Sequence, residues 1–208
     1  MQFPFSPEFR ATLAARCRAF PRLAHDGPEL TRAAVALTLV AADDGSGEAA
    51  FLLTRRAASL RAHAGQWALP GGRCDEGETP VTAALRELAE ELGLELKPDD
   101  VLGLLDDYPT RSGYLITPVV VWAAPGAVPS PNASEVASVH RIALEHIERR
   151  DAFDFVTIPE SHRRVIRFHL AGQMIHAPTA ALIYQFREVL EGRDTRVAEL
   201  EQPVFAWK

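Results

Sequence analysis

Three glutamates on one short segment of this chain are the side chains best suited to chemistry. Glu87, Glu90 and Glu91 follow a Pro-Gly-Gly turn that ends at Gly72. Because each helical residue advances about 100° around the axis, three such carboxylates on a helix lie within roughly 100° of arc. An acidic helix face is often only a solvated surface. The alternative reason to keep these charges together is a hard divalent cation that prefers oxygen ligands, Mg²⁺ or Mn²⁺.

The residues around these glutamates predict the helix that positions them. Thr79 suits the N-cap, Pro80 the first turn and Gly93 the C-terminal stop. The opposite helix face is apolar and comprises Val81, Ala84, Leu85, Leu88 and Leu92. The helix can therefore dock on a core while its acidic face points outward. Arg86 flanks that face, where it can orient a carboxylate through a charge-assisted hydrogen bond.

Residues 72–94, GRCDEGETPVTAALRELAEELGL, resemble the Nudix box. That pattern is a glycine, then a glutamate, then R-E-U-x-E-E-x-G-U at fixed spacing, where U is a bulky aliphatic residue. Every specified position is filled, by Gly72, Glu78, Arg86, Glu87, Leu88, Glu90, Glu91, Gly93 and Leu94. On ordinary residue frequencies, such a match is expected by accident in fewer than about one chain in a million. The resemblance implies an α/β/α sandwich with a mixed central sheet.

The reaction that the resemblance implies is metal-assisted hydrolysis of a phosphoanhydride. Glu87 and Glu91, one helical turn apart, are expected to hold the principal cation. Glu90 is a third candidate ligand, and the carbonyl of Gly72 completes the expected set. Family members take their general base either from the box or from a later loop, so Glu87 and Glu135 are both candidates. Glu135 is equally compatible with an ordinary surface acid.

Two further residues of the box are expected to support this chemistry. Glu78 is placed in a supporting role, bonded either to Arg86 or to the backbone of the preceding loop. Arg86 is counted with the catalytic residues because it flanks the carboxylates. The acidic cluster is therefore expected to be held by charge-assisted hydrogen bonds.

Residues 52–72 narrow the expected substrate. They read LLTRRAASLRAHAGQWALPGG and resemble the signature of Nudix coenzyme A pyrophosphatases. The matching residues are Leu52, Leu53, Thr54, Arg56, Ala57, Arg61, Gly65, Pro70, Gly71 and Gly72. Leu69 departs from the signature, which has phenylalanine there. The whole resemblance spans roughly residues 34–190 and is most specific at 52–94.

The arginines of this second pattern suit the phosphates of coenzyme A. That molecule carries a diphosphate and a 3′-phosphate, and arginine binds phosphate oxygens in a bidentate manner. We therefore expect Arg56 and Arg61 to bind substrate beside Gly71 and Gly72, although a basic loop can also simply aid solubility. Trp67 could stack on a base, but a tryptophan at the start of a strand more often belongs to the core.

Three functions are compatible with these patterns. The favoured one is hydrolysis of coenzyme A to 3′,5′-ADP and 4′-phosphopantetheine. The second is hydrolysis of ADP-ribose, a dinucleotide or a nucleoside triphosphate by an enzyme of the same family. The third is a catalytically silent Nudix fold used for binding, which is expected to have lost acids of the box. All of them are present here.

Composition sets the class of protein and of partner. The chain has 208 residues, of which 47% are hydrophobic and 24% charged, as expected for a folded domain with a sizeable core. A net charge of −6 argues against general nucleic-acid binding, which needs a basic surface. The two cysteines are too few for a disulfide framework or a zinc cluster. The expected partner is a small nucleotide substrate, and a homodimer is compatible with the sequence.

The order of predicted elements is mixed α/β. Helices are predicted at residues 7–20, with Ser6 as cap, and 178–190, and strands at 34–40, 49–54, 67–69, 101–105, 115–123, 135–142, 153–158 and 165–170. A short turn or helix is predicted at 143–147. We expect residues 1–30 to form a helical extension packed on the same domain, 31–195 the Nudix domain and 196–208 a tail. Because no apolar run resembles a signal peptide or a membrane span, the expected location is the cytoplasm.

Overall fold

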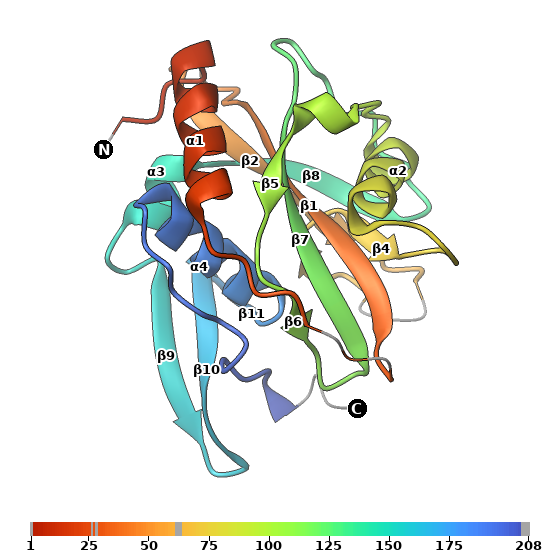
Figure 1. Ribbon diagram of the computed structural model, residues 1–208, viewed down its shortest axis with the longest axis vertical. Helices are drawn as coiled ribbons and strands as arrows, with labels where there is room; N and C mark the ends of the chain where they lie inside the picture. The colour runs from red at the N-terminus through yellow and green to blue at the C-terminus, as the bar shows by residue number, and fades with distance from the viewer. Residues whose placement is uncertain (1, 26, 28, 61–63, 205–208) are drawn as a thin grey trace.

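The computed structural model describes residues 2–25, 27, 29–60 and 64–204 (Figure 1). Its helices are α1 (Pro7–Ala19), α2 (Pro80–Leu92), α3 (Leu144–Glu148) and α4 (Thr179–Leu190), with a short 3-10 helix at Pro98–Asp100. Its strands are β1 (Thr31–Ala41), β2 (Ala49–Arg56), β3 (Trp67–Ala68), β4 (Gly71–Arg73), β5 (Val101–Leu104), β6 (Tyr108–Pro109), β7 (Tyr114–Trp122), β8 (Val136–Ala143), β9 (Phe153–Ile158), β10 (Ser161–Leu170) and β11 (Gln173–His176). Each element predicted from the sequence recurs here, with ends shifted by a few residues.

The large sheet is mixed. Its path runs β3-β2-β1-β7-β5, with β4 beside β1, β6 beside β7 and β8 beside β2. Strands β1 and β7 run parallel, whereas the other pairs in this sheet are antiparallel. The predicted hairpin of β1 and β2 forms, with Leu39 opposite Phe51.

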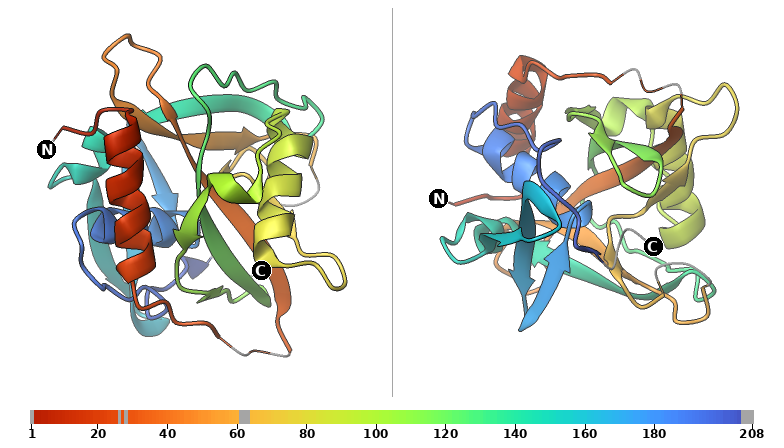
Figure 2. Two further views of the ribbon diagram at one scale, coloured as in Figure 1. Left: turned by 45° about the horizontal axis from the view of Figure 1, so that its top comes forward. Right: turned by 90° about the horizontal axis from the view of Figure 1, so that it is seen from below.

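Side-chain alternation along β1 explains why helices cover both faces of this sheet. Leu37 and Leu39 point to one face and pack with α1 and α4, while Ala36 and Val40 point to the other and pack with α2. Successive side chains of a strand alternate in this way, so a strand that is apolar throughout needs cover on both sides. Figure 2 shows α1 and α2 on opposite sides of the sheet. The fold is therefore the expected α/β/α sandwich.

A second, three-stranded sheet extends the core on the side of α4. Its order is β11-β10-β9, and all pairs are antiparallel. The rings of Phe153 and Phe168 stack in its buried face, with centroids 4.9 Å apart. Strand β11 leads directly into α4, and this connection brings the small sheet to the edge of the large one. None of the helices described is long and apolar enough to cross a bilayer.

The Pro-Gly-Gly segment corrects one sequence-based expectation. A turn was predicted there, but Gly71 and Gly72 belong to β4, which pairs with β1. A methyl group on Gly71 would lie 2.2 Å from the carbonyl oxygen of Ala34 and 2.6 Å from the Cα of Val35. Glycine is required here for two reasons. Two backbones approach closely, and the φ of Gly71, 153°, is one that residues with a side chain rarely adopt.

Residues 197–203 run back across the domain and are held by buried polar contacts. Glu201 has 2% of its surface exposed and accepts two hydrogen bonds from the Arg111 guanidinium, at 3.1 and 2.6 Å. The hydroxyl of Ser161 donates to the same carboxylate, and Tyr108 donates to the carbonyl oxygen of Leu200. The bonds from Arg111 lower the pKa of Glu201 to about 2.

Glu201→Gln is expected to destabilise the protein at neutral pH but not in strong acid. The carboxyl has a lower pKa folded, about 2, than its ordinary 4.5, so its stabilising effect is present above pH 4.5 and is lost as pH falls toward 2. Because half of Arg111 is exposed to water, we expect the free energy of unfolding to drop by about 2 kcal/mol at pH 7. Urea titrations between pH 7 and pH 2 measure the difference. Glu199→Gln, which alters an exposed neighbour, is the control; a pH-independent difference would contradict the account.

Candidate active site

Helix α2 presents the three predicted carboxylates. The hydroxyl of Thr79 accepts the N–H of Thr82 at 3.1 Å, and Gly93 ends the helix in the left-handed conformation, with φ of 63°. Both caps were predicted from the sequence. They fix the start and the end of the helix, and therefore the direction in which each glutamate points.

The backbone of β4 passes directly over the carboxylate of Glu87. A methyl group built on Gly72 would lie 2.2 Å from Oε1 of Glu87, which is closer than any real contact. Only a residue without a side chain leaves room for this arrangement. Gly72 and Glu87, predicted to share a site, are therefore in contact distance of one another.

Glu91 is buried, contrary to the expectation that the whole acidic face points outward. Only 6% of its side chain is exposed, and its Oε2 accepts the N–H of Gly71 at 3.3 Å. Burial and the charge of Glu87 raise the pKa of Glu91 to about 7. The guanidinium of Arg56 approaches its other oxygen at 4.0 Å. The reason for the difference is that β4 and the end of β2 cover this turn of the helix.

Arg86 forms hydrogen bonds with the other three acids of the box. Its Nη1 donates to Glu87 at 2.9 Å and to Glu90 at 3.1 Å, while its Nε and Nη2 bond the two oxygens of Glu78 at 3.1 Å. These bonds lower the pKa of Glu78. For Glu87 the burial of its carboxyl dominates and raises the pKa. Glu78 thus supports Arg86, as the sequence predicted, and it also accepts the N–H of Asp75.

The loop that carries Glu135 is tied to the same site. The N–H of Asn132 donates to the carbonyl oxygen of Glu91 at 2.9 Å, and the carbonyl oxygen of Glu135 accepts the N–H of Ala57 at 2.8 Å. The negative charge of Glu135 contributes to the raised pKa of both Glu87 and Glu91. The fold therefore brings Glu135 within electrostatic reach of the box helix, although it lies far along the chain.

The carboxylates of this cluster are ligands that suit a hard divalent cation, but their oxygen atoms do not point toward one common position. Within the residues that the structure describes, no three His, Cys, Asp or Glu side chains converge as metal ligands. Glu87 and Glu90 each bond to Arg86 through one carboxylate oxygen, and the second oxygen of each is the one that would meet a cation. The fit rests on Glu91, a buried carboxyl beside Glu87, since such a pair is stabilised by a cation. The glycine backbone supplies room and a carbonyl oxygen.

A cavity of about 350 Å³ adjoins this cluster on the other side of β4. Gly71, Gly72 and Arg56 line it, so three of the predicted substrate-binding residues lie together. Within the described part of the chain, the buried Nε of Arg56 has no hydrogen-bond partner. Arg61, the fourth predicted binding residue, lies outside the described residues.

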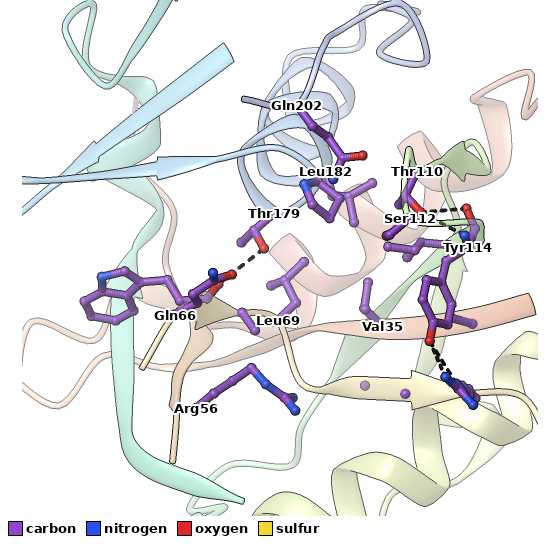
Figure 3. A pocket seen from close by; sticks show the side chains of 18 residues that line it. Val35, Arg56, Gln66, Leu69, Thr110, Ser112, Tyr114, Thr179, Leu182 and Gln202 are labelled. Atoms are coloured by element: carbon purple, nitrogen blue, oxygen red, sulfur yellow. Dashed lines mark hydrogen bonds between the residues drawn. The ribbon is translucent and has the colours of Figure 1, made fainter. Parts of the chain in front are cut away.

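Most other residues of the cavity wall were not predicted from the sequence. Figure 3 shows Gln202, Leu182 and Thr179 facing Val35 and Leu69, with Tyr114 at one end. They come from α4, β1, β7, the link between β3 and β4, and the C-terminal segment, which meet only in the folded chain. The resemblance, which spans roughly residues 34–190, covers all of these residues except Gln202, and no local pattern marks Gln202 as a wall residue.

The sequence and the fold of this chain are similar to those of known proteins. The family model described as the NUDIX domain matches residues 30–163. The "Uncharacterized Nudix hydrolase NudL" of Photorhabdus laumondii is 33% identical over 144 residues, which cover 68% of this chain and 77% of that protein. The protein of the same description from Pectobacterium atrosepticum is 36% identical over 139 residues, covering 65% and 72%. The solved MutT/nudix family protein from Enterococcus faecalis has the same fold, with a TM-score of 0.53 at 16% identity, covering 90% of this chain and 74% of that one.

Proposed function

This chain belongs to the Nudix hydrolase family, and from that premise we propose that it hydrolyses the diphosphate bridge of coenzyme A or its derivatives. The products are 3′,5′-ADP and 4′-phosphopantetheine. The observation that carries the diphosphate hydrolysis is the contact between Gly72 and Glu87, because it sets the first glycine of the box against one of the acids of the box. The match of Arg56 and Arg61 to that signature supports the choice of substrate.

Nudix hydrolases generally use divalent metal ions, and Glu87, Glu91, Glu90 and the Gly72 carbonyl are the groups that would hold one here. When bound, the ion supplies neutralisation of the diphosphate charge and a more acidic water. Mg²⁺ and Mn²⁺ both suit carboxylate and carbonyl oxygens. The remaining steps fall to side chains of this protein.

The side chains around the cluster divide the work of binding, orientation and proton transfer. Arg56 binds the diphosphate with its guanidinium, and Arg86 orients the carboxylate of Glu87 through the bond at 2.9 Å. The carboxylate of Glu87 or of Glu135 accepts the proton of the water that attacks phosphorus. The bond from phosphorus to the bridging oxygen then breaks, and the two halves leave as phosphate monoesters.

A substrate panel tests the proposal. Coenzyme A, ADP-ribose and NADH are compared at equal concentration, each with Mg²⁺ and with Mn²⁺, and kcat/KM is measured for each pair. We expect coenzyme A to be hydrolysed with the highest kcat/KM. A preference for ADP-ribose or NADH would assign the protein to the second function, and no turnover of any substrate would favour a binding module.

Arg56→Ala is expected to raise KM by about tenfold or more, because a bidentate contact to the diphosphate is lost. The effect is expected on every diphosphate substrate that the enzyme accepts, since all share this group. Steady-state kinetics on two substrates with different remote groups checks this. Arg18→Ala removes an equal charge from an exposed position on α1 and serves as control. A rise in KM for one substrate only would mean that Arg56 contacts a group other than the diphosphate.

A further inference from the structure

A second cavity, of about 300 Å³, continues the first one away from the carboxylates. The two share five wall residues, Gln66, Trp67, Pro178, Thr179 and Gln202. Beyond these, the second cavity is bordered by β11 with Met174, and by Pro203 of the C-terminal segment. The two cavities therefore adjoin, and Arg56, Gly71 and Gly72 line the first one only.

The walls of both cavities suit an uncharged chain that forms hydrogen bonds. Aliphatic side chains such as Val35, Leu69 and Leu182 alternate with the hydroxyl of Thr179 and the amide of Gln202. Among the described wall residues of either cavity none is acidic, and the basic ones are Arg56 and Arg73 in the first cavity and Arg55 and His176 in the second. A binding site of this composition holds apolar groups by burial and fixes them with a few polar contacts.

The two large aromatic rings of the walls are already engaged by arginines. The guanidinium of Arg73 lies over the ring of Tyr114, 5.3 Å from its centroid, and also donates to its hydroxyl oxygen. The guanidinium of Arg55 lies over Trp67 at 5.1 Å. The indole N–H of Trp67 donates to Gln173, which also accepts from Arg55. This arrangement favours an aliphatic arm over a stacked base in the groove.

The C-terminal segment forms a fixed part of this groove. The amide oxygen of Gln202 accepts the backbone N–H of Arg111 at 2.6 Å, and the N–H of Gln202 donates to Glu201 at 3.0 Å. Glu201 in turn is held by the Arg111 side chain. Gln202 is therefore locked in position where the two cavities meet, and a preorganised wall of this kind can select ligands by length.

We propose that the two cavities form one groove for the long uncharged arm of the substrate, the part attached to the phosphate remote from the nucleoside, and that Met174 and Gln202 make the groove specific for long arms. This inference rests on the proposed diphosphate hydrolysis and adds which half of the substrate lies where. The nucleoside half lies outside the groove. A short substituent reaches only the first cavity and gains nothing from the second.

Direct binding of the two product halves tests the assignment. Met174→Trp adds a large ring at a side chain that lines only the second cavity and is 52% exposed, so the fold is expected to tolerate it. In calorimetry with Mg²⁺, we expect this variant to bind 4′-phosphopantetheine at least about tenfold more weakly than the unaltered protein, the scale of losing a well-packed contact. Its affinity for 3′,5′-ADP is expected to stay the same.

His162→Trp is the matched control, because it adds the same ring to an exposed position on the same small sheet. Gln202→Ala is the second variant and is expected to weaken 4′-phosphopantetheine as well. The inference is overturned if the unaltered protein does not bind 4′-phosphopantetheine, if both Met174→Trp and Gln202→Ala bind it as tightly as the unaltered protein, or if Met174→Trp weakens 3′,5′-ADP instead.

Assays with the unaltered protein and with Met174→Trp distinguish a failure of this inference from a failure of the proposed function. Coenzyme A that stays intact with the unaltered enzyme refutes the proposed function, while a weakened 4′-phosphopantetheine complex of Met174→Trp still supports the groove. Conversely, turnover of coenzyme A with an unchanged KM in Met174→Trp refutes the groove and leaves the hydrolysis standing.

Discussion

Glu91→Gln is expected to abolish turnover, lowering kcat by at least about a thousandfold, and to leave the fold intact. The amide keeps the shape of the side chain and can still accept the N–H of Gly71. It removes the negative charge that is buried beside Glu87 and that the proposed metal site needs. Measurements of kcat with saturating Mg²⁺ or Mn²⁺ give the size of the loss.

Thermal unfolding distinguishes a loss of charge from a loss of structure. Burial raises the pKa of Glu91 to about 7, so in the absence of metal the folded state becomes less stable as pH rises from 4.5 through 7. The neutral amide removes this penalty, and the Tm of Glu91→Gln at pH 8 without metal is expected to equal or exceed that of the unaltered protein. Added Mg²⁺ is expected to raise the Tm of the unaltered protein only.

Glu95→Gln is the control for this prediction, because it alters an exposed acid just beyond the end of the same helix. It is expected to retain full activity and the full stabilisation by Mg²⁺. Full activity in Glu91→Gln would refute the assignment of Glu91 as a metal ligand. A collapse of Tm would instead identify Glu91 as a structural residue.

The helix and its acids could be predicted because their signals are local. The caps at Thr79 and Gly93 and the spacing of the glutamates lie within one stretch of sequence, and each has a direct physical meaning. The same holds for the pairing of Glu78 with Arg86. The fold class followed from the resemblance, and the mixed order of predicted strands and helices was compatible with it.

The burial of Glu91 could not be predicted in the same way. A helical projection places it on the acidic face, but β4 lies against that face and shields it from water. The pairing of β4 with β1 sets Gly71 opposite Val35 and Gly72 opposite Ala34, residues that are distant in sequence. The Pro-Gly-Gly sequence alone is equally typical of a turn, because glycine and proline occur both in turns and where two backbones lie close together.

The groove was missed for a related reason. Its walls come from the start of α4, from β11 and from the C-terminal segment, which sequence analysis treated as a tail. Gln202 is placed by Arg111, about ninety residues earlier, so no window of sequence contains both. Residues that line a cavity from several elements become visible only when the elements are assembled.

Gly72→Ala is expected to lower kcat by about a hundredfold or more while the protein stays folded. The added methyl would lie 2.2 Å from Oε1 of Glu87, so the end of that side chain has to move aside and loses its 2.9 Å bond with Arg86. The main-chain conformation at Gly72 does not itself require glycine, so the strand is expected to tolerate alanine. The displaced Glu87 can then no longer keep its position toward Arg86 and the proposed cation. Kinetics together with Tm measures both effects.

A double-variant cycle decides whether the methyl acts through Glu87. If it does, Gly72→Ala added to Glu87→Ala lowers kcat no further than Glu87→Ala alone, because the atom that it strikes is gone. Equal losses in both backgrounds would mean that the methyl disturbs the strand or the substrate directly. Since Gly72 also lines the first cavity, that outcome would shift the role of this glycine from placing a carboxylate to admitting the diphosphate.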